Sequence, residues 1–423
     1  MTKPQLTLEQ GQAIETMVTF LRDPEAQFFL LAGYAGTGKT FCIQNLVDLA
    51  RGRLIFTAPT NKATKVLRDT LTTDQYKPEC RTIYSLLGLR LEANGEVKEL
   101  AVPEDPVDLT QYRAVIVDEG SMVNSKLFAF IQQVANDQKV KFIFMGDPAQ
   151  LPPVGEQRSP IWEHCHKVAE LTRVMRHDNQ ILTLATAIRK VVDHPAPRLN
   201  FQSDNADGQG VWRLGEGEFE ARIMQATDAG RFSRANDAKA IAWRNVTVDA
   251  LNRRIRQRIF DNAASQPWLP DDRVLVMEPA KDHEGNTVAT TDDEGTITRV
   301  EVDWHPEWRE FKVWRVSVTT DDNRPIVLRV LHEDCFAEHA RRVEELAQAA
   351  RLDRRKWGTF WDFKEAFHKL RHAYAITAHR AQGSTYEAAF VDWKDILSNR
   401  NRSEAFRCLY VACTRPKKEL YLG

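Results

Sequence analysis

Short runs of consecutive apolar residues alternate along this chain with longer segments in which apolar residues recur at helical spacing. The first such runs cover residues 28–32, 54–57, 114–117 and 142–145, and helical spacing is clearest over residues 8–21 and 41–49. Continuous apolar strands that alternate with helices are typical of a parallel β-sheet covered on both faces. The pattern therefore predicts an α/β fold.

A second set of the same kind begins after about residue 177, with buried-strand candidates at residues 240–243, 389–391 and 419–422. A chain of 423 residues is long for one hydrophobic core, so the length favours two or more domains. Between these strands the texture changes to short alternating strands at residues 274–276, 295–298 and 314–318. Turn residues such as 284–286 separate them, which indicates a small β-barrel inserted into the second α/β domain.

A second insert covers residues 89–100, where Asn94-Gly95 stands between charged and apolar residues. An Asn-Gly pair is a strong signal for a tight β-hairpin turn. We therefore expect a hairpin in the first domain.

The segment from Gly33 to Thr40 reads GYAGTGKT and fits the pattern G-x-x-x-x-G-K-[ST] in full. It follows a predicted strand and opens a predicted helix, the context in which backbone N–H groups surround phosphates. Lys39 is then expected to reach the β- and γ-phosphates and Thr40 to bind Mg²⁺. The predicted ATP-binding residues of this loop are Gly33, Ala35, Gly36, Thr37, Gly38, Lys39 and Thr40.

Acidic and amide side chains follow two other strands of the same set. Asp118 and Glu119 end the strand at 114–117, where Asp118 suits the Mg²⁺ shell and Glu119 suits a general base for the attacking water. Gln150, after the strand at 142–145, is expected to sense the γ-phosphate or orient water; the plain reading is a proline-stiffened loop. Arg176 and Arg415 are candidates for stabilising transition-state charge, although spacing alone leaves a surface role equally open.

Composition changes this picture little. Net charge is -1, with 43% hydrophobic and 28% charged residues, which argues against a disordered chain and mildly against a nucleic-acid binder. The six cysteines form no Cys-x-x-Cys pair, so we expect a reducing compartment, and His164-Cys165-His166 lacks a second cluster with zinc spacing. No segment reads as a signal peptide or a membrane span, which predicts a cytoplasmic protein (host cytoplasm if phage-encoded) that makes no membrane contact.

Taken in order, these blocks resemble superfamily 1 helicases of the 1B branch, the branch that includes RecD-like and Dda-like enzymes. The resemblance covers nearly the whole chain, and the Dda-like pattern is the better match. It is carried by Leu6-Thr7-x-x-Gln10 (Q motif) and by residues 33–40 (motif I), 57–63 (Ia), 82–87, 118–122 (II), 146–154 (III), 171–176, 243–252, 360–363, 377–384 (V) and 410–415 (VI). Gly120, Arg380 and Pro416 depart from the family pattern, and Arg380 for lysine bears on how DNA is gripped.

The resemblance implies two RecA-like motor domains with two inserts. RecA-like domain 1A is expected over residues 1–88 and 101–176, a β-hairpin pin (1B) over 89–100, RecA-like domain 2A over 177–270 and 372–423, and an SH3-like β-barrel (2B) over 271–371. It also implies that Gln10 reads adenine, that Gly383 and Glu387 belong to the ATP site, and that Arg176 and Arg415 act as arginine fingers. The DNA-binding residues it implies are Pro59, Thr60, Asn61, Thr82, Tyr84, Asn245, Thr377 and His379.

Several aromatic and basic residues stay open on chemistry alone. Tyr84 either stacks on a base or packs in the core. The basic runs 253–258 and 351–356 could line a DNA track, and a solvated helix face is favoured for both. Trp304, Trp308 and Trp314 are expected to pack within the barrel insert.

The sequence thus predicts an ATP- and Mg²⁺-dependent DNA helicase that moves 5′→3′ on single-stranded DNA and opens forked duplexes as a monomer, with replication or recombination proteins as possible partners. A DNA-binding ATP switch that does not unwind is the second hypothesis, and a small-molecule P-loop kinase the third. Phosphate contacts do not distinguish the sugars, so RNA stays open as a substrate.

Overall fold

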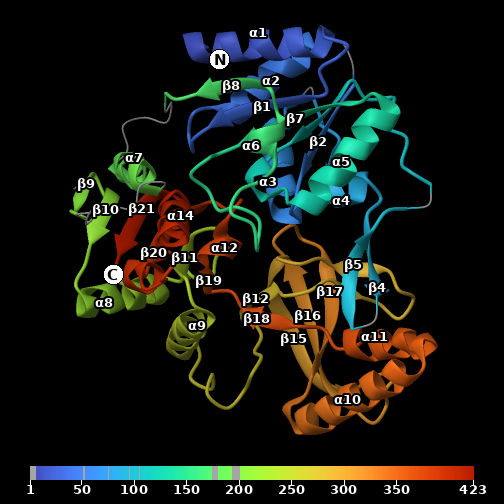
Figure 1. The fold of residues 1–423 in the computed structure, drawn as a ribbon. Coiled ribbons are helices and arrows are strands. Elements are labelled where there is room, and N and C mark those ends of the chain that lie inside the picture. Colours follow the sequence, from blue (N-terminus) through green and yellow to red (C-terminus); the bar gives the residue numbers. More distant parts are fainter. Residues whose placement is uncertain are drawn as a thin grey trace.

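The computed structural model describes residues 6–50, 53–74, 76–94, 96–103, 105–173, 180–192 and 201–423. Two six-stranded sheets and one five-stranded sheet form its framework (Figure 1). Within the described residues no helix is long and apolar enough to cross a membrane. All six cysteines are free thiols.

The first sheet has the strand order β3-β2-β6-β7-β1-β8, and every neighbouring pair is parallel. Its strands are β1 (Phe28–Gly33), β2 (Leu54–Ala58), β3 (Cys80–Thr82), β6 (Ala114–Val117), β7 (Lys141–Gly146) and β8 (Lys167–Leu171). Strand β6 is buried along its whole length, as its unbroken apolar run requires. The parallel sheet that the sequence predicts is therefore confirmed.

Helices cover both faces of this sheet. One face packs against α1 (Leu8–Arg22), α2 (Lys39–Leu49) and α3 (Asn61–Leu71), the other against α4 (Ile83–Leu86), α5 (Ser125–Gln138) and α6 (Ile161–His164). Helix α1 begins with a capping box, in which the Thr7 hydroxyl accepts from the Gln10 N–H and the Gln10 side chain accepts from the Thr7 N–H. A 3₁₀ turn, η1 (Gly120–Met122), follows β6.

The second sheet has the order β19-β11-β20-β21-β10-β9 and is parallel except for the edge pair β9 and β10. Its strands are β9 (Asp204–Ala206), β10 (Gln209–Arg213), β11 (Ala238–Ala242), β19 (Ala375–Thr377), β20 (Tyr386–Val391) and β21 (Pro416–Leu422). Helices α7 (Gln180–Val192), α13 (Trp393–Leu397) and α14 (Arg402–Cys413) share one core with the sheet, and α8 (Glu216–Asp228) and α9 (Asn245–Ile259) share the other. The four-residue helix α12 (Ala378–Ala381) lies between β19 and β20.

The third sheet is antiparallel throughout, with the order β17-β16-β15-β12-β18. Its strands are β12 (Arg273–Val276), β15 (Glu294–Trp304), β16 (Lys312–Thr320), β17 (Pro325–Leu331) and β18 (Leu370–His372), beside a small hairpin of β13 (Ala280–Lys281) and β14 (Thr287–Ala289). Helices α10 (Phe336–Leu352) and α11 (Trp357–Glu365) extend from it, with the 3₁₀ turns η2 (Glu333–Cys335) and η3 (Arg354–Lys356). The short strands predicted here are present; the SH3-like assignment and the domain boundaries stay predictions.

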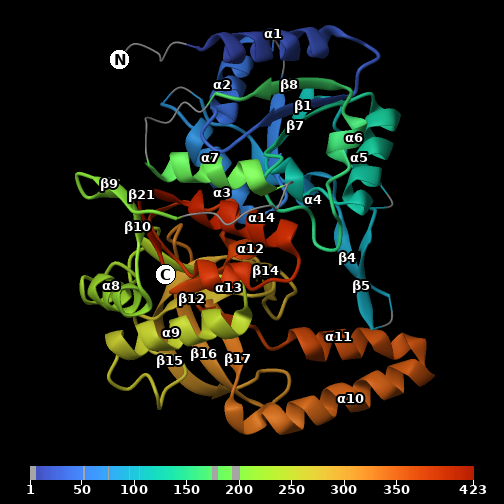
Figure 2. The ribbon, with the colours of Figure 1, turned by 60° about the vertical axis from the view of Figure 1, so that its left-hand side comes forward.

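A two-stranded hairpin occupies the region where the sequence predicts one. Strands β4 (Arg90–Asn94) and β5 (Val97–Ala101) pair from Arg90 with Ala101 to Asn94 with Val97. The hairpin reaches from the first sheet towards α11 (Figures 1 and 2). There Lys98 forms an ion pair with Glu365 and its Nζ lies 4.9 Å from the centroid of the Trp361 ring. The hairpin is therefore in contact with α11, which extends from the third sheet.

Two expectations about surface residues need correction. Trp308 packs against Phe363 and Trp314 packs against His332, as expected. Trp304, the last residue of β15, is instead 53% exposed. In the basic run of α9 the helix face is not uniformly solvated: Arg256 is buried, and its guanidinium donates to Asp272.

Asp272 holds α9 against the start of the third sheet. It is fully buried and accepts hydrogen bonds from Arg256 Nε at 2.9 and 3.0 Å, from the Leu269 N–H at 2.9 Å and from the Tyr374 hydroxyl at 2.9 Å. Burial alone would raise the pKa of Asp272, but His372 and Arg256 hold it below its ordinary value. The carboxylate is therefore charged and fully paired.

Replacing Asp272 by alanine should lower the free energy of unfolding by about 3–5 kcal/mol, because a buried guanidinium loses its counter-charge. The measurement is guanidinium chloride unfolding followed by circular dichroism. The matched control is Asp228→Ala, which removes the partner of Arg258 from a pair whose side chains are about half exposed. That change should cost far less, because solvent screens an exposed pair; equal losses in the two variants would contradict the assignment.

Candidate functional site between the two parallel sheets

Apart from Gln10 of α1, the candidate residues of the first sheet follow the carboxyl ends of its strands. The phosphate loop follows β1, Gln150 follows β7 and Asp118 follows β6, and these three strands are neighbours in the sheet. Thr60 and Thr82 follow β2 and β3, which form the other half of the same edge. Because the strands are parallel, these ends share one edge of the sheet, where ligands of open α/β sheets bind. The ATP and DNA candidates therefore occupy neighbouring halves of one edge.

The phosphate loop turns sharply between β1 and α2. Gly36 and Gly38 have φ of 81° and 87°, and α2 begins at Lys39. Lys39 Nζ donates to the carbonyls of Gly33 at 2.6 Å and Tyr34 at 3.1 Å. The Lys39 ammonium thus lies against the loop that is expected to bind the nucleotide phosphates. Thr40 is the second residue of α2.

Gln10 lies directly on this loop. Its side chain is buried, and its Nε2 donates to the Thr37 carbonyl at 3.1 Å. A Cβ added at Gly38 would stand 2.5 Å from that Nε2, and the backbone φ of 87° also favours glycine there. Gln10 therefore braces the phosphate loop in this structure, and its predicted contact with adenine stays a prediction.

Asp118 and Glu119 form a half-buried acidic pair after β6. The Glu119 N–H donates to Asp118 Oδ1 at 2.8 Å, and Glu119 has a left-handed backbone with φ 49°. Burial raises the pKa of Asp118. Burial and the Asp118 charge raise the pKa of Glu119 to about 7, against the opposing effects of Arg415, Lys39 and Gln382. A strained, electrostatically perturbed carboxylate is typical of a functional site.

Gln150 contacts a residue that the sequence analysis did not assign. Gln382, which follows α12, donates from Nε2 to Gln150 Oε1 at 3.2 Å and to Glu119 Oε2 at 3.4 Å. Gln150 and Gln382 are both buried. The structure thus brings the predicted amide and the predicted general base together through a residue of the second sheet.

Arg415 precedes β21 and reaches the same region from the second sheet. The residue is 6% exposed, and its guanidinium donates to the carbonyls of Val411 at 2.9 Å and Ser384 at 3.1 Å, and to the Thr414 hydroxyl at 2.9 Å. It lies near enough to Glu119 to lower the pKa of that carboxyl. Arg415 therefore borders the cleft while its hydrogen bonds stay within its own sheet. Arg176 lies outside the described residues.

Tyr410 makes a second contact across the cleft that the sequence did not suggest. Its hydroxyl donates to Asp147 Oδ2 at 2.8 Å and accepts from the Ala35 N–H of the phosphate loop at 3.2 Å. Burial and the Asp147 charge raise the pKa of Tyr410, so the hydroxyl remains protonated. Arg407, on the same helix, donates to the carbonyls of Pro148 and Gln150. No motif residue type marks such cross-sheet contacts, which is why they were missed.

Gly383 and Glu387 occupy different surroundings. Gly383 lies against Ala63 of α3, where an added Cβ would be 3.3 Å from the Ala63 Cβ. Glu387, on β20, forms ion pairs with Lys417 at 3.3 Å and Lys418 at 3.0 Å, and these lysines lower its pKa. Its predicted place in the ATP site stays a prediction.

Most of the predicted DNA-binding residues lie at the N-termini of helices that follow strands of the two sheets. Thr60, Thr82 and Thr377 are N-caps of α3, α4 and α12, with Pro59 and Asn61 on either side of Thr60. Asn245 begins α9, and its side-chain oxygen accepts from Arg371. Tyr84 is half-buried against the core beneath α4, which favours the packing interpretation.

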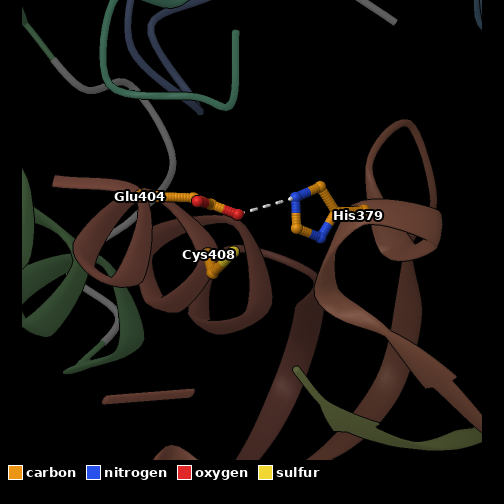
Figure 3. Close-up of side chains that lie close together, drawn as sticks. All are labelled: His379, Glu404 and Cys408. Carbon is orange, nitrogen blue, oxygen red and sulfur yellow. Dashed lines mark ion pairs between the residues drawn. The ribbon is translucent and has the colours of Figure 1, made fainter. Parts of the chain in front are cut away.

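His379 lines a cavity of about 780 Å³ between the two sheets. Gln150, Glu404 and Arg407 also line it. Figure 3 shows His379 facing Glu404, with Nε2 3.5 Å from Oε1, and Cys408 one turn along α14. Burial lowers the pKa of His379 and raises that of the Cys408 thiol to about 12, so the Cys408 sulfur is a protonated thiol within the core.

Comparisons with known proteins match this arrangement from end to end. A family model described as an AAA domain matches residues 5–206, and one described as a UvrD-like helicase C-terminal domain matches residues 372–422. The ATP-dependent DNA helicase dda of Enterobacteria phage T4 is 26% identical over 459 residues, covering 100% of both chains. Together these matches support a superfamily 1B helicase related to Dda.

Two further relatives extend the likeness. An uncharacterised protein of Acanthamoeba polyphaga mimivirus is 23% identical over 505 residues, covering 99% of this helicase and 98% of the viral protein. The crystal structure of Pif1 helicase from Bacteroides in complex with ADP-AlF3 and ssDNA has a TM-score of 0.53 and 17% identity, covering 99% of this helicase and 92% of that chain. The last likeness shows a shared fold of two RecA-like domains.

The departures of this helicase from the family pattern have local causes. A Cβ at Gly120 would lie 2.9 Å from Ile161 Cδ1 and 3.0 Å from the Met145 carbonyl, so packing excludes a larger residue. Arg380 forms an ion pair with Asp292, in the segment between β14 and β15. Its guanidinium is therefore engaged with the third-sheet region.

Proposed function

We propose that this helicase uses ATP and Mg²⁺ to move 5′→3′ along single-stranded DNA and to open forked duplexes. The observation that carries the proposal is that phosphate-loop, acidic and amide residues of the first sheet meet Gln382, Tyr410 and Arg415 of the second across one cleft. Nucleotide bound there would touch both sheets, so its binding and release can change the distance between them.

The proposed roles follow the chemistry of each side chain. Lys39 holds the β- and γ-phosphates, and Glu119 accepts the proton of the attacking water, a task suited to a carboxyl whose pKa is near 7. Gln150 orients that water or the γ-phosphate. Arg415, and Arg176 from the segment before α7, stabilise negative charge on the phosphate; Arg415 must first release Ser384 and Val411.

A divalent cation fits the oxygen ligands near Lys39. Thr40 offers a hydroxyl and Asp118 a carboxylate whose Oδ1 already accepts from a backbone N–H, and hard cations such as Mg²⁺ prefer such oxygens. When bound, the cation would neutralise charge between the β- and γ-phosphates.

Proposed DNA contacts lie at Pro59, Thr60, Asn61, Thr82, Tyr84, Asn245, Thr377 and His379. Single-stranded DNA is also what the Bacteroides Pif1 complex contains, which supports the assignment by analogy. The short polar side chains suit phosphate contacts that read no sequence. A monomeric motor and partners in replication or recombination remain part of the proposal.

Replacing Lys39 by alanine should reduce DNA-stimulated ATP hydrolysis at least about 100-fold, because a preorganised charge on the phosphates is removed. The measurement is phosphate release with saturating oligothymidylate. Lys126→Ala, at an exposed position of α5, is the matched control and should retain the wild-type rate. Full activity of the Lys39 variant would contradict the ATP-site assignment.

A fork with only a 5′ single-stranded tail should be unwound, and a fork with only a 3′ tail should not. Strand separation followed by a fluorophore–quencher pair measures this directly. The opposite preference would refute the polarity, and ATP-driven DNA binding with no unwinding of either fork would favour the non-unwinding switch.

A hairpin variant sharpens the same assay. Shortening residues 89–100 should leave DNA-stimulated ATP hydrolysis near wild type but reduce strand separation, because the hairpin lies apart from the ATP cleft and contacts α11. Equal loss of both activities would argue against a role for the hairpin in strand separation.

DNA affinity should rise as the pH falls through the pKa of His379. Burial places that pKa below its ordinary value of about 6.5, so His379 is neutral at pH 7.5 and gains a positive charge only on acidification. A charged contact with phosphate is stronger than a neutral one, so the affinity should rise about fivefold once the pH lies below that lowered pKa. Fluorescence anisotropy with labelled oligothymidylate measures it.

The control variants identify the residue. His379→Gln should flatten the pH dependence, whereas His164→Gln, which changes a ring stacked on Phe128 of α5, should leave it intact. An unchanged pH dependence in His379→Gln would exclude His379 as the titrating contact.

A further inference from the structure

Gln382 links the two parallel sheets at the centre of the cleft. It belongs to the second sheet, where it is the C-cap of α12, and its side-chain amide is 7% exposed. Its Nε2 lies 3.2 Å from Gln150 Oε1 and 3.4 Å from Glu119 Oε2, both on loops of the first sheet. A primary amide has two N–H donors, and this geometry assigns one to each oxygen.

These two hydrogen bonds fix the relative position of the proposed base and the proposed water-orienting amide. Glu119 Oε2 accepts from Gln382, so the donor fixes the orientation of the Glu119 carboxylate. Hydrogen bonds to a carboxylate are stronger and more directional than neutral ones. Losing the donor would let Glu119 and Gln150 adopt other rotamers in a cleft where geometry decides the rate.

The chain around Gln382 crosses from one edge of the second sheet to the other. Strands β19 and β20 are both parallel to β11, with Thr377 beside Ala242 and Ala388 beside Ala238. Thr377 therefore stands at the carboxyl edge and Tyr386 at the amino edge. Residues 377–386 join the proposed DNA contacts to the ATP cleft in a single short segment.

Buried alanines and hydrogen bonds hold that segment in place. Ala378 and Ala381 of α12 are fully buried, and the Thr377 hydroxyl caps the helix by accepting from the Arg380 N–H at 3.4 Å. The Gln382 N–H donates to the His379 carbonyl at 3.3 Å. A shift of His379 on DNA binding would thus move Gln382, because both belong to one hydrogen-bonded turn.

We propose that Gln382 is a positioning residue that couples DNA bound at α12 to ATP hydrolysis by holding Glu119 and Gln150 in their reactive arrangement. The inference rests on the proposed function and adds the route by which DNA stimulates the ATPase. Gln382 acts through Glu119 and Gln150 and not on the phosphates directly.

The test replaces Gln382 by methionine, which keeps the side-chain length and removes both donors. Steady-state ATP hydrolysis with saturating oligothymidylate should show kcat reduced about ten- to hundredfold, as expected when a reacting group is misplaced. KM for ATP and the dissociation constant for the oligonucleotide should stay near the wild-type values, because the phosphate loop and the DNA contacts are unchanged. Adding Gln150→Met to this variant should lower kcat little further, since both changes break one hydrogen-bonded unit.

The matched control is Gln27→Met. Gln27 Nε2 also donates to a partner distant in sequence, the Ala135 carbonyl at 2.9 Å, but within the first sheet and its helices. This change should lower stability without lowering kcat in folded protein. Should the Gln382→Met chain not fold, Gln382→Asn retains the amide on a shorter side chain that cannot reach both oxygens, and the same loss of kcat is expected.

Each result has one reading. An unchanged DNA-stimulated kcat in a folded Gln382 variant overturns the inference and leaves the proposed function intact. Parallel losses in kcat, ATP affinity and DNA affinity also overturn it, because they indicate a general structural role. A wild-type chain whose ATP hydrolysis does not respond to DNA overturns the proposed function itself, and the coupling with it.

Discussion

The hydrogen bonds that cross the cleft between the two parallel sheets are the contacts on which the rest of the structure depends. Tyr410 joins Asp147 and the Ala35 N–H, and Gln382 joins Gln150 and Glu119. Each bond pairs a residue near the C-terminus with a loop that follows a strand of the first sheet. Buried polar groups must be paired, so these bonds hold the sheets at one separation until a nucleotide competes for the same groups.

The contacts of the phosphate loop show which groups a nucleotide would have to displace. Lys39 satisfies its charge with the carbonyls of Gly33 and Tyr34, and the Ala35 N–H donates to Tyr410. The Arg189 guanidinium of α7 lies 3.7 Å from the centroid of the Tyr34 ring. Phosphate oxygens would attract Lys39 and the loop N–H groups away from these partners, so nucleotide binding and the contact between sheets are linked.

A buried ionic junction ties the third sheet to both of the others. Glu294 of β15 accepts from Lys62 of α3 at 2.8 Å and from Lys239 of β11 at 2.9 Å. Although burial alone would raise it, Lys239, Lys62 and Arg273 hold the pKa of Glu294 well below its ordinary value. The third-sheet region, which contacts the hairpin through α11, is therefore linked to any change in the separation of the two sheets on nucleotide binding. Separating the sheets would leave Lys62 without its carboxylate.

Much of this could be predicted from the sequence because the signals are local. The apolar run at residues 114–117 coincides with β6, and the predicted hairpin coincides with the pairing of β4 and β5. The phosphate loop combines a fixed spacing with a strand and a helix, so its position followed directly. Edge strand β8, with exposed and buried residues mixed, carries no such run and was missed.

The contacts that join the sheets could not be predicted in this way. Gln382 and Tyr410 lie 232 and 263 residues along the chain from Gln150 and Asp147, and neither side chain is of a type that signals such a contact. Arg256 belongs to a basic run for which the sequence favours a solvated helix face, yet it is buried beside Asp272. Such pairings depend on how distant segments pack, which periodicity does not encode.

A structure of the helicase with ADP-aluminium fluoride and single-stranded DNA tests the central claim most directly, because that complex imitates the phosphate during hydrolysis. The account predicts that Arg415 leaves the carbonyls of Ser384 and Val411 and contacts the fluoride, with Lys39 turned from Gly33 to the phosphates. An Arg415 that keeps its present hydrogen bonds and does not touch the fluoride would contradict it.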